Sequence, residues 1–138
     1  MTPDPSKWKH IGTSSNAKFY EADEDVLVVM PDEGSTDTAT SADESIRIQV
    51  EYLREHNRRA GTVVMMDGLA GQDVGARAVY RDKPDPSHQV CFALVGGTTF
   101  GRTAGSIFTS LAPPRCPTRL FTDFDEAVAW VKTMVRAR

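Results

Sequence analysis

The sequence predicts an α/β domain with a mixed, mainly parallel sheet, an N-terminal β-hairpin and about four helices. From about residue 61 onward, short apolar runs typical of buried strands alternate with amphipathic helical stretches. Such alternation favours a parallel sheet with right-handed crossovers. Before it, two β-prone runs flank an acidic turn, which is the pattern of a hairpin. The chain has 138 residues, the length of one domain.

The composition is that of an ordinary globular protein. Hydrophobic residues make up 40% and charged residues 25% of the chain. The net charge of −3 gives no reason to expect a nucleic-acid partner, because such binding relies on a positive surface. No apolar run approaches the roughly 20 residues that span a bilayer, and the N-terminus lacks the apolar core of a signal peptide. We therefore expect a cytoplasmic protein with no membrane span.

The first thirty residues are expected to hold a tail and the hairpin. Residues 1–7 contain two prolines and little that could be buried, so we expect a disordered tail there and a single domain over residues 8–138. Trp8–Ile11 is a candidate edge strand. The hairpin is formed by Ala17–Ala22 and Val26–Met30, and the second run is continuously apolar, as in a strand covered on both faces.

The first helix is predicted to begin near Ser41. Ser41 and Glu44 have the spacing of a capping box, in which each side chain accepts a backbone N–H at the start of the helix. The apolar residues of its buried face recur at helical spacing and are Ile46, Val50 and Leu53. Gly61 is expected to end this helix. The polar segment that precedes the helix, residues 32–40, is expected to be a loop.

Three strands and three helices complete the predicted order. The strands are Thr62–Met66, Gln89–Val95 and Thr118–Phe121. The helices are Asp73–Arg81, Phe100–Leu111 and a last one that begins at Thr122 or Asp123. The last helix has an apolar face of Phe124, Ala127, Val128, Val131 and Val135.

Two glycine-rich turns, residues 67–72 and 96–102, are the candidate ligand site. Both are expected at the carboxyl ends of parallel strands, where open α/β sheets bind ligands at a switch point, and before helix N-termini, which attract anions. The candidate residues are Asp67, Gly68, Gly71, Arg77, Gly97, Thr98, Thr99 and Arg102. The simpler alternative is that the glycines permit tight turns and Thr99 caps a helix, since neither turn has the spacing of a phosphate motif.

Three further residues are candidates for contact with a partner: Tyr80, Arg81 and Trp130. Trp130 lies next to the apolar face of the last helix. It either packs at the edge of the core or anchors a partner as an exposed aromatic residue.

The sequence gives little sign of catalysis or of a metal. Asp67 could act as a general base, but a lone acid at the end of a strand is more often a turn residue. The three histidines are scattered, without ligand spacing to Cys or Asp, so no zinc site or other cofactor is indicated. Cys91 is expected inside a buried strand, and Cys116, between prolines, at the surface.

Residues 62–136 resemble the SpoIIAA-like or STAS-like domains of bacteria, in an uncharacterised branch. The resemblance rests on residues 92–102 (FALVGGTTFGR), on 117–122 (PTRLFT) and on 126–131 (EAVAWV). It implies a non-enzymatic regulatory or binding module that contacts a protein partner or a small anionic or apolar ligand, and it allows a homodimer.

The wider family includes anti-sigma-factor antagonists, which are switched by phosphorylation of a Ser or Thr after a strand that ends in Asp. Here that turn reads Gly68-Leu69-Ala70-Gly71, with no hydroxyl group, so the switch does not carry over. Two alternatives stay open. One is a small hydrolase or transferase that uses Asp67, and the other is a lipid-binding pocket between the sheet and Phe100–Leu111.

Overall fold

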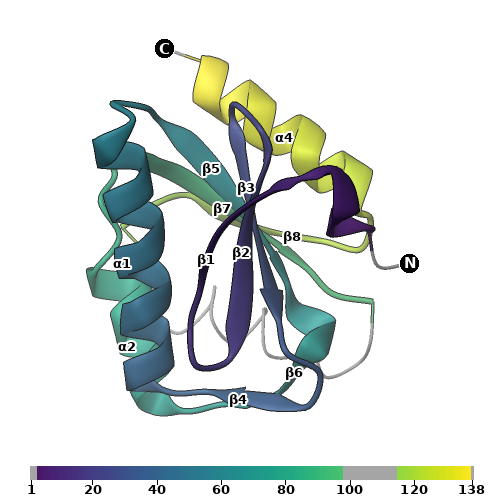
Figure 1. Ribbon diagram of the computed structural model, residues 1–138, viewed down its shortest axis with the longest axis vertical. Helices are drawn as coiled ribbons and strands as arrows, with labels where there is room; N and C mark the ends of the chain where they lie inside the picture. The colour runs from purple at the N-terminus through teal and green to yellow at the C-terminus, as the bar shows by residue number, and fades with distance from the viewer. Residues whose placement is uncertain (1–2, 98–114, 138) are drawn as a thin grey trace.

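The computed structural model describes residues 3–97 and 115–137, and a six-stranded sheet lies at its centre (Figure 1). The strands, in spatial order, are β1 (Lys9–Thr13), β2 (Ala17–Asp23), β3 (Val26–Pro31), β5 (Ala60–Met65), β7 (Gln89–Val95) and β8 (Thr118–Phe121). β1, β2 and β3 pair antiparallel, whereas β5, β7 and β8 continue the sheet parallel to β3. The predicted mixed sheet is therefore confirmed. The predicted hairpin is β2–β3, and β1, which overlaps the candidate edge strand Trp8–Ile11, extends it to a three-stranded meander.

Three α-helices and a second, small sheet complete the described part of the chain. The helices are α1 (Ala39–Glu55), α2 (Val74–Asp82) and α4 (Phe124–Arg136), and the small parallel sheet pairs β4 (Ser35–Asp37) with β6 (Leu69–Gln72). Short 3-10 turns are η1 (Pro5–Lys7), within the segment expected as a tail, and η2 (Met66–Gly68). The predicted helix Phe100–Leu111 lies outside the described residues. No described helix has the length and apolar character needed to cross a membrane.

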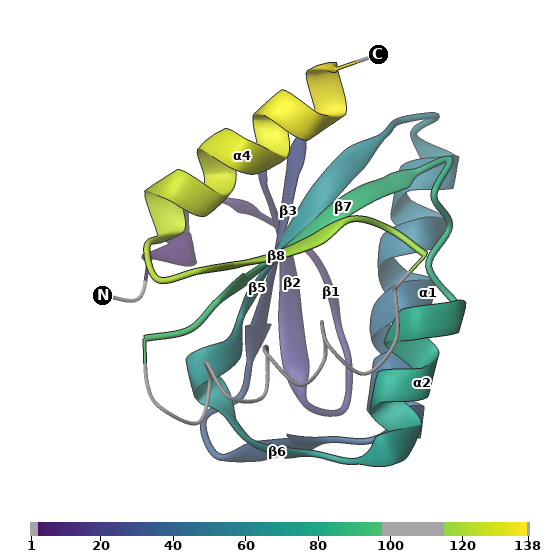
Figure 2. The same ribbon diagram turned by 180° about the vertical axis from the view of Figure 1, so that it is seen from behind.

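The helices cover opposite faces of the sheet, as the two views show (Figures 1 and 2). Side chains alternate between the two faces along each strand. On one face, Val63, Cys91 and Ala93 pack against α4, where they meet Ala127 and Val131. The strand residues that alternate with these face α1 and α2. Phe92, for example, packs with Ile46 and Val50 of α1. Burial on both faces explains why the parallel strands are almost continuously apolar.

The order of the strands explains why α1 and α2 share a face. From β3 the chain proceeds to β5, β7 and β8 in one direction across the sheet. Right-handed crossovers that all move the same way place their helices on the same side. Because the direction never reverses among these strands, the sheet has no topological switch point within the described residues. The argument for a ligand crevice at such a point therefore does not apply there.

The start and the end of α1 differ from the prediction. The helix begins at Ala39 and is capped by Thr38, whose side chain accepts the Ser41 N–H while Ser41 Oγ accepts the Thr38 N–H. A capping box is thus present three residues earlier than the expected Ser41–Glu44 pair. At the other end, α1 stops at Glu55, and Asn57 takes the left-handed conformation (φ 51°). Gly61, expected to end the helix, lies instead within β5.

Two further expectations are corrected. The segment 67–72 is not one glycine-rich turn, because its last four residues form the strand β6, which pairs with β4. Cys116 is not at the surface: it is 1% exposed, and its Sγ donates to the Gln89 carbonyl. Burial raises the pKa of Cys116 to about 11 and that of Cys91 to about 12, so both thiols stay protonated at neutral pH.

A buried polar chain joins α1 to the sheet. Gln49, 1% exposed, donates through Nε2 to Ser45 Oγ (3.1 Å). Its Oε1 accepts from Thr62 Oγ1 of β5 (2.6 Å) and from Gln89 Nε2 of β7 (3.1 Å). Gln89 Oε1 in turn accepts the Asp85 N–H. Each member has a partner, as buried polar groups require.

The loop before β7 provides a prediction on acid stability. Ser87 Oγ donates to Asp85 (2.5 Å), and Arg54 and His88 also contact this carboxyl, so its pKa lies below the ordinary 3.8. A lowered pKa adds stability that is full above about pH 5 and is lost as the pH falls through 3.8 toward the folded-state pKa.

We therefore expect Asp85→Asn to reduce the loss of unfolding free energy between pH 5 and pH 3, measured by urea denaturation at each pH. Ser87→Ala should act in the same direction, since Ser87 is the largest cause of the shift. Equal losses in the wild type and in both variants would show that Asp85 does not contribute to acid sensitivity.

Candidate functional site

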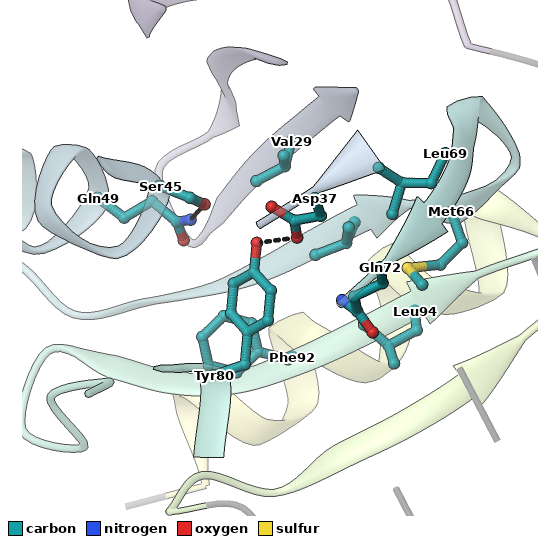
Figure 3. Close-up of a pocket in the computed structure, with 11 residues that line it drawn as sticks. Val29, Asp37, Ser45, Gln49, Met66, Leu69, Gln72, Tyr80, Phe92 and Leu94 are labelled. Atoms are coloured by element: carbon teal, nitrogen blue, oxygen red, sulfur yellow. Dashed lines mark hydrogen bonds between the residues drawn. The ribbon is translucent and has the colours of Figure 1, made fainter. Parts of the chain in front are cut away.

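A largely apolar cavity lies between the sheet and the pair α1 and α2 (Figure 3). Each of the surrounding elements contributes to its wall. The described lining residues are Val29, Asp37, Ser45, Gln49, Val64, Met66, Leu69, Gln72, Tyr80, Phe92 and Leu94. The small β4–β6 sheet supplies Asp37, Leu69 and Gln72, so its short strands form one side of the cavity.

The cavity is small. Its volume is about 30 Å³, a few times the roughly 10–15 Å³ that holds one water and well below the roughly 150 Å³ of an apolar cavity that binds benzene. A molecule the size of one ring therefore fits only when side chains of the wall move apart.

Asp37 is the most heavily bonded polar group of the wall. It is 3% exposed, and its carboxylate accepts from Tyr80 OH (2.6 Å), Asn16 Nδ2 (3.3 Å) and Ser41 Oγ. Three side chains that can donate thus surround this one carboxyl group. Burial, and then the nearby charge of Asp37, raise the pKa of the Tyr80 hydroxyl well above its ordinary value, so Tyr80 remains a donor.

Gln72 differs from the other polar groups of the wall. Within the described part of the chain, three buried side-chain polar atoms have no hydrogen-bond partner: Ser35 Oγ, Gln72 Oε1 and Arg77 Nε. All three lie on β4, on β6 or on the helix that follows. Only Gln72 lines the cavity, and Figure 3 shows its amide beside Met66 and Leu94. Ser45 and Gln49, by contrast, are hydrogen-bonded to each other.

The two glycine-rich turns of the sequence meet at a second, larger crevice with a volume of about 180 Å³. Gly97 N–H donates to both carboxylate oxygens of Asp67 at 3.0 Å. Asp67, Gly68 and Gly97 line a crevice at the carboxyl ends of β3, β5, β7 and β8, and Glu33 lines it as well. Both charged groups among the described lining residues are acids, which is the opposite of an anion site.

The remaining candidates from the sequence are separated in space. Gly71 lies in β6 near Thr36, and Arg77 approaches the Gln72 carbonyl (3.5 Å), so neither is among the described residues of the crevice. Thr98, Thr99 and Arg102 lie outside the described residues.

Of the partner-contact candidates, only Arg81 is exposed. It forms two 2.8 Å hydrogen bonds with neighbouring Asp82. Trp130 is half-buried against Phe121, with ring centroids 5.6 Å apart. Tyr80 directs its hydroxyl inward to Asp37.

Sequence reasoning missed Asp37 and Gln72, which it assigned to a loop and a turn. One signal was available on α1, where Ser45 and Gln49 lie four residues apart on the same face as Ile46 and Val50. Polar residues within a buried stripe indicate an internal hydrogen-bond network. No group of three or more His, Cys, Asp or Glu side chains able to hold a metal is found in residues 3–97 and 115–137.

The arrangement of sheet and helices is a SpoIIAA-like fold. One solved structure of similar architecture is an uncharacterised protein of the DUF3478 family, with a SpoIIAA-like fold, from Shewanella loihica PV-4. The alignment covers 87% of this chain and 99% of that one, with a TM-score of 0.53 and 13% identity. At that identity the likeness concerns the fold.

The model of the family described as "Domain of unknown function (DUF7793)" matches residues 20–135. The chain belongs to that family. No match is found among curated proteins.

Proposed function

We propose that this protein is a non-enzymatic, SpoIIAA-like binding module that takes one compact, mainly apolar molecule in the cavity between the sheet and α1–α2. The observation that supports this function is the apolar void itself, because native interiors are close-packed and contain few voids larger than a water molecule. Transfer of a small apolar molecule from water into apolar surroundings is favourable.

The position of the cavity suits a regulatory role. Its wall is built from the sheet, from α1 and α2, and from the β4–β6 pair, so an occupant contacts several elements at once. Binding to the folded state alone stabilises that state by mass action. Occupancy is thus expected to fix the β4–β6 pair against the helices.

The enzymatic alternative has weaker support. Asp67 is exposed, and both of its oxygens accept the backbone N–H of Gly97. That contact fixes the turn after β7, which is the role of a turn residue rather than of a base held ready for substrate. We therefore assign Asp67 a structural role.

Toluene is a suitable probe of the cavity, since it is compact and carries no polar group. At ten times its Kd, a ligand adds about 1.4 kcal/mol to the free energy of unfolding, or about 4 °C in Tm for a chain of this size. We expect a rise of that order in thermal denaturation, and saturable shifts of the NMR signals of the cavity residues.

Two valine positions provide a matched comparison. Val64→Phe fills the cavity, whereas Val74→Phe places the same ring on α2 at a position that is 76% exposed. Toluene should still stabilise Val74→Phe and should no longer stabilise Val64→Phe. Leu69→Phe fills the cavity from β6 and replaces Val64→Phe if that variant does not fold. Absence of saturable binding to the wild type, or equal binding to filled and unfilled variants, would contradict the proposal.

A further inference from the structure

We propose that Gln72 selects the occupant of this cavity, so that the preferred ligand carries one hydrogen-bond donor on an apolar body no larger than a single ring. The ligand class is that of neutral phenols, small cyclic alcohols and related N–H heterocycles. The inference rests on the proposed function, since it names the chemistry of the same cavity.

The unpaired amide oxygen is the first reason. Gln72 Oε1 is buried, and nothing in the described part of the chain donates to it. A buried acceptor without a donor costs free energy, because it has lost its hydrogen bonds to water. A hydrogen bond from a partner offsets that cost. A donor on the ligand would supply that partner.

Water satisfies this oxygen poorly. A buried water needs two to four polar partners, but Met66 and Leu94, which lie beside the Gln72 amide in Figure 3, offer none. A ligand with one donor and an apolar remainder matches an amide oxygen that lies among apolar side chains.

Charge narrows the class further. The Asp37 carboxylate lines the same cavity and is almost fully buried. A negatively charged ligand would be placed next to a buried negative charge, which is strongly unfavourable. Anionic acids are therefore disfavoured, and the size of the cavity does not admit a long acyl chain.

The backbone fixes the position of Gln72 independently of its side chain. Gln72 pairs with Asp37 in the β4–β6 sheet, and its carbonyl oxygen lies 3.5 Å from Arg77 Nη2. Gln72→Met keeps these backbone contacts and a side chain of similar length while removing the acceptor. The variant thus tests the amide alone.

The test is a calorimetric or NMR titration of the full chain with phenol and, as the matched probe without a donor, toluene. For phenol we expect Kd to rise about tenfold in Gln72→Met, as for the loss of one buried hydrogen bond. For toluene we expect Kd to stay within about twofold of the wild-type value or to fall, because the variant removes an unpaired polar atom.

The outcomes separate the two proposals. If toluene binds the wild type but phenol binds wild type and Gln72→Met equally, the cavity is a ligand site and the role given to Gln72 is wrong. If neither probe binds the wild type, both proposals fail.

Discussion

Gln49→Leu is expected to lower the free energy of unfolding by about 3 kcal/mol, because it leaves several buried polar groups without partners at about 1–3 kcal/mol each. Thr62 Oγ1 and Gln89 Nε2 both donate to Gln49 Oε1, and these two residues are fully buried in β5 and β7. Leucine has a similar volume, so a cavity contributes little. For a chain of this length the loss corresponds to about 10 °C in Tm.

Chemical denaturation of single and double variants separates this network from general packing. Gln49→Leu combined with Thr62→Val removes both members of one hydrogen bond, so the double variant should be more stable than the sum of the single losses predicts. Glu51→Leu, on the exposed side of α1, is the control and should change stability by less than about 0.5 kcal/mol. If the losses of unfolding free energy in Gln49→Leu and Thr62→Val simply add in the double variant, the two side chains are not coupled and the network is contradicted.

Gly61→Ala is expected to be the second most disruptive change, with a loss of about 2 kcal/mol from overpacking. A Cβ atom at Gly61 would lie 2.6 Å from both Cys91 Sγ and Val131 Cγ1, which is closer than these atoms can approach. The backbone of β5 must therefore lie close to α4, and glycine permits that approach.

Gly71→Ala is the matched control for this prediction. The nearest described atoms to a Cβ there belong to Thr36, at 3.7 Å, an ordinary van der Waals distance. At such a site alanine is expected to be neutral or to stabilise by about 0.5 kcal/mol through the unfolded state. Val131→Ala should reduce the loss caused by Gly61→Ala, since it removes Val131 Cγ1, one of the two atoms that the new Cβ would crowd. Equal thermal stability of Gly61→Ala and Gly71→Ala would show that the contact with α4 is not tight.

The sequence predicted those elements whose signals are local. β7 and β8 have the predicted bounds, and α4 begins after Asp123, whose side chain accepts the Glu126 N–H. Two kinds of local signal predict these elements without knowledge of the fold. They are continuous apolar runs, and a capping residue three positions before an acidic one.

The cavity depends on pairings that no local pattern reveals. β4 and β6 are three and four residues long, and register pairs Asp37 with Gln72 across more than thirty positions. Strands so short have no measurable alternation. The partners of the buried Asp37 include Tyr80, from α2, and Asn16, before β2, which are distant in the sequence. The sequence therefore predicted a ligand site at the glycine-rich turns and gave no signal for the cavity between the sheet and α1–α2.

The central claim is that the space between the sheet and α1–α2 receives a compact apolar ligand. Intermolecular nuclear Overhauser effects between toluene and the methyl groups of the isotope-labelled protein test it most directly. We predict contacts from toluene to Val64, Leu69 and Leu94, whose side chains line the cavity. Contacts confined to exposed apolar side chains such as Val74 and Leu120, with none to the cavity residues, would contradict the claim.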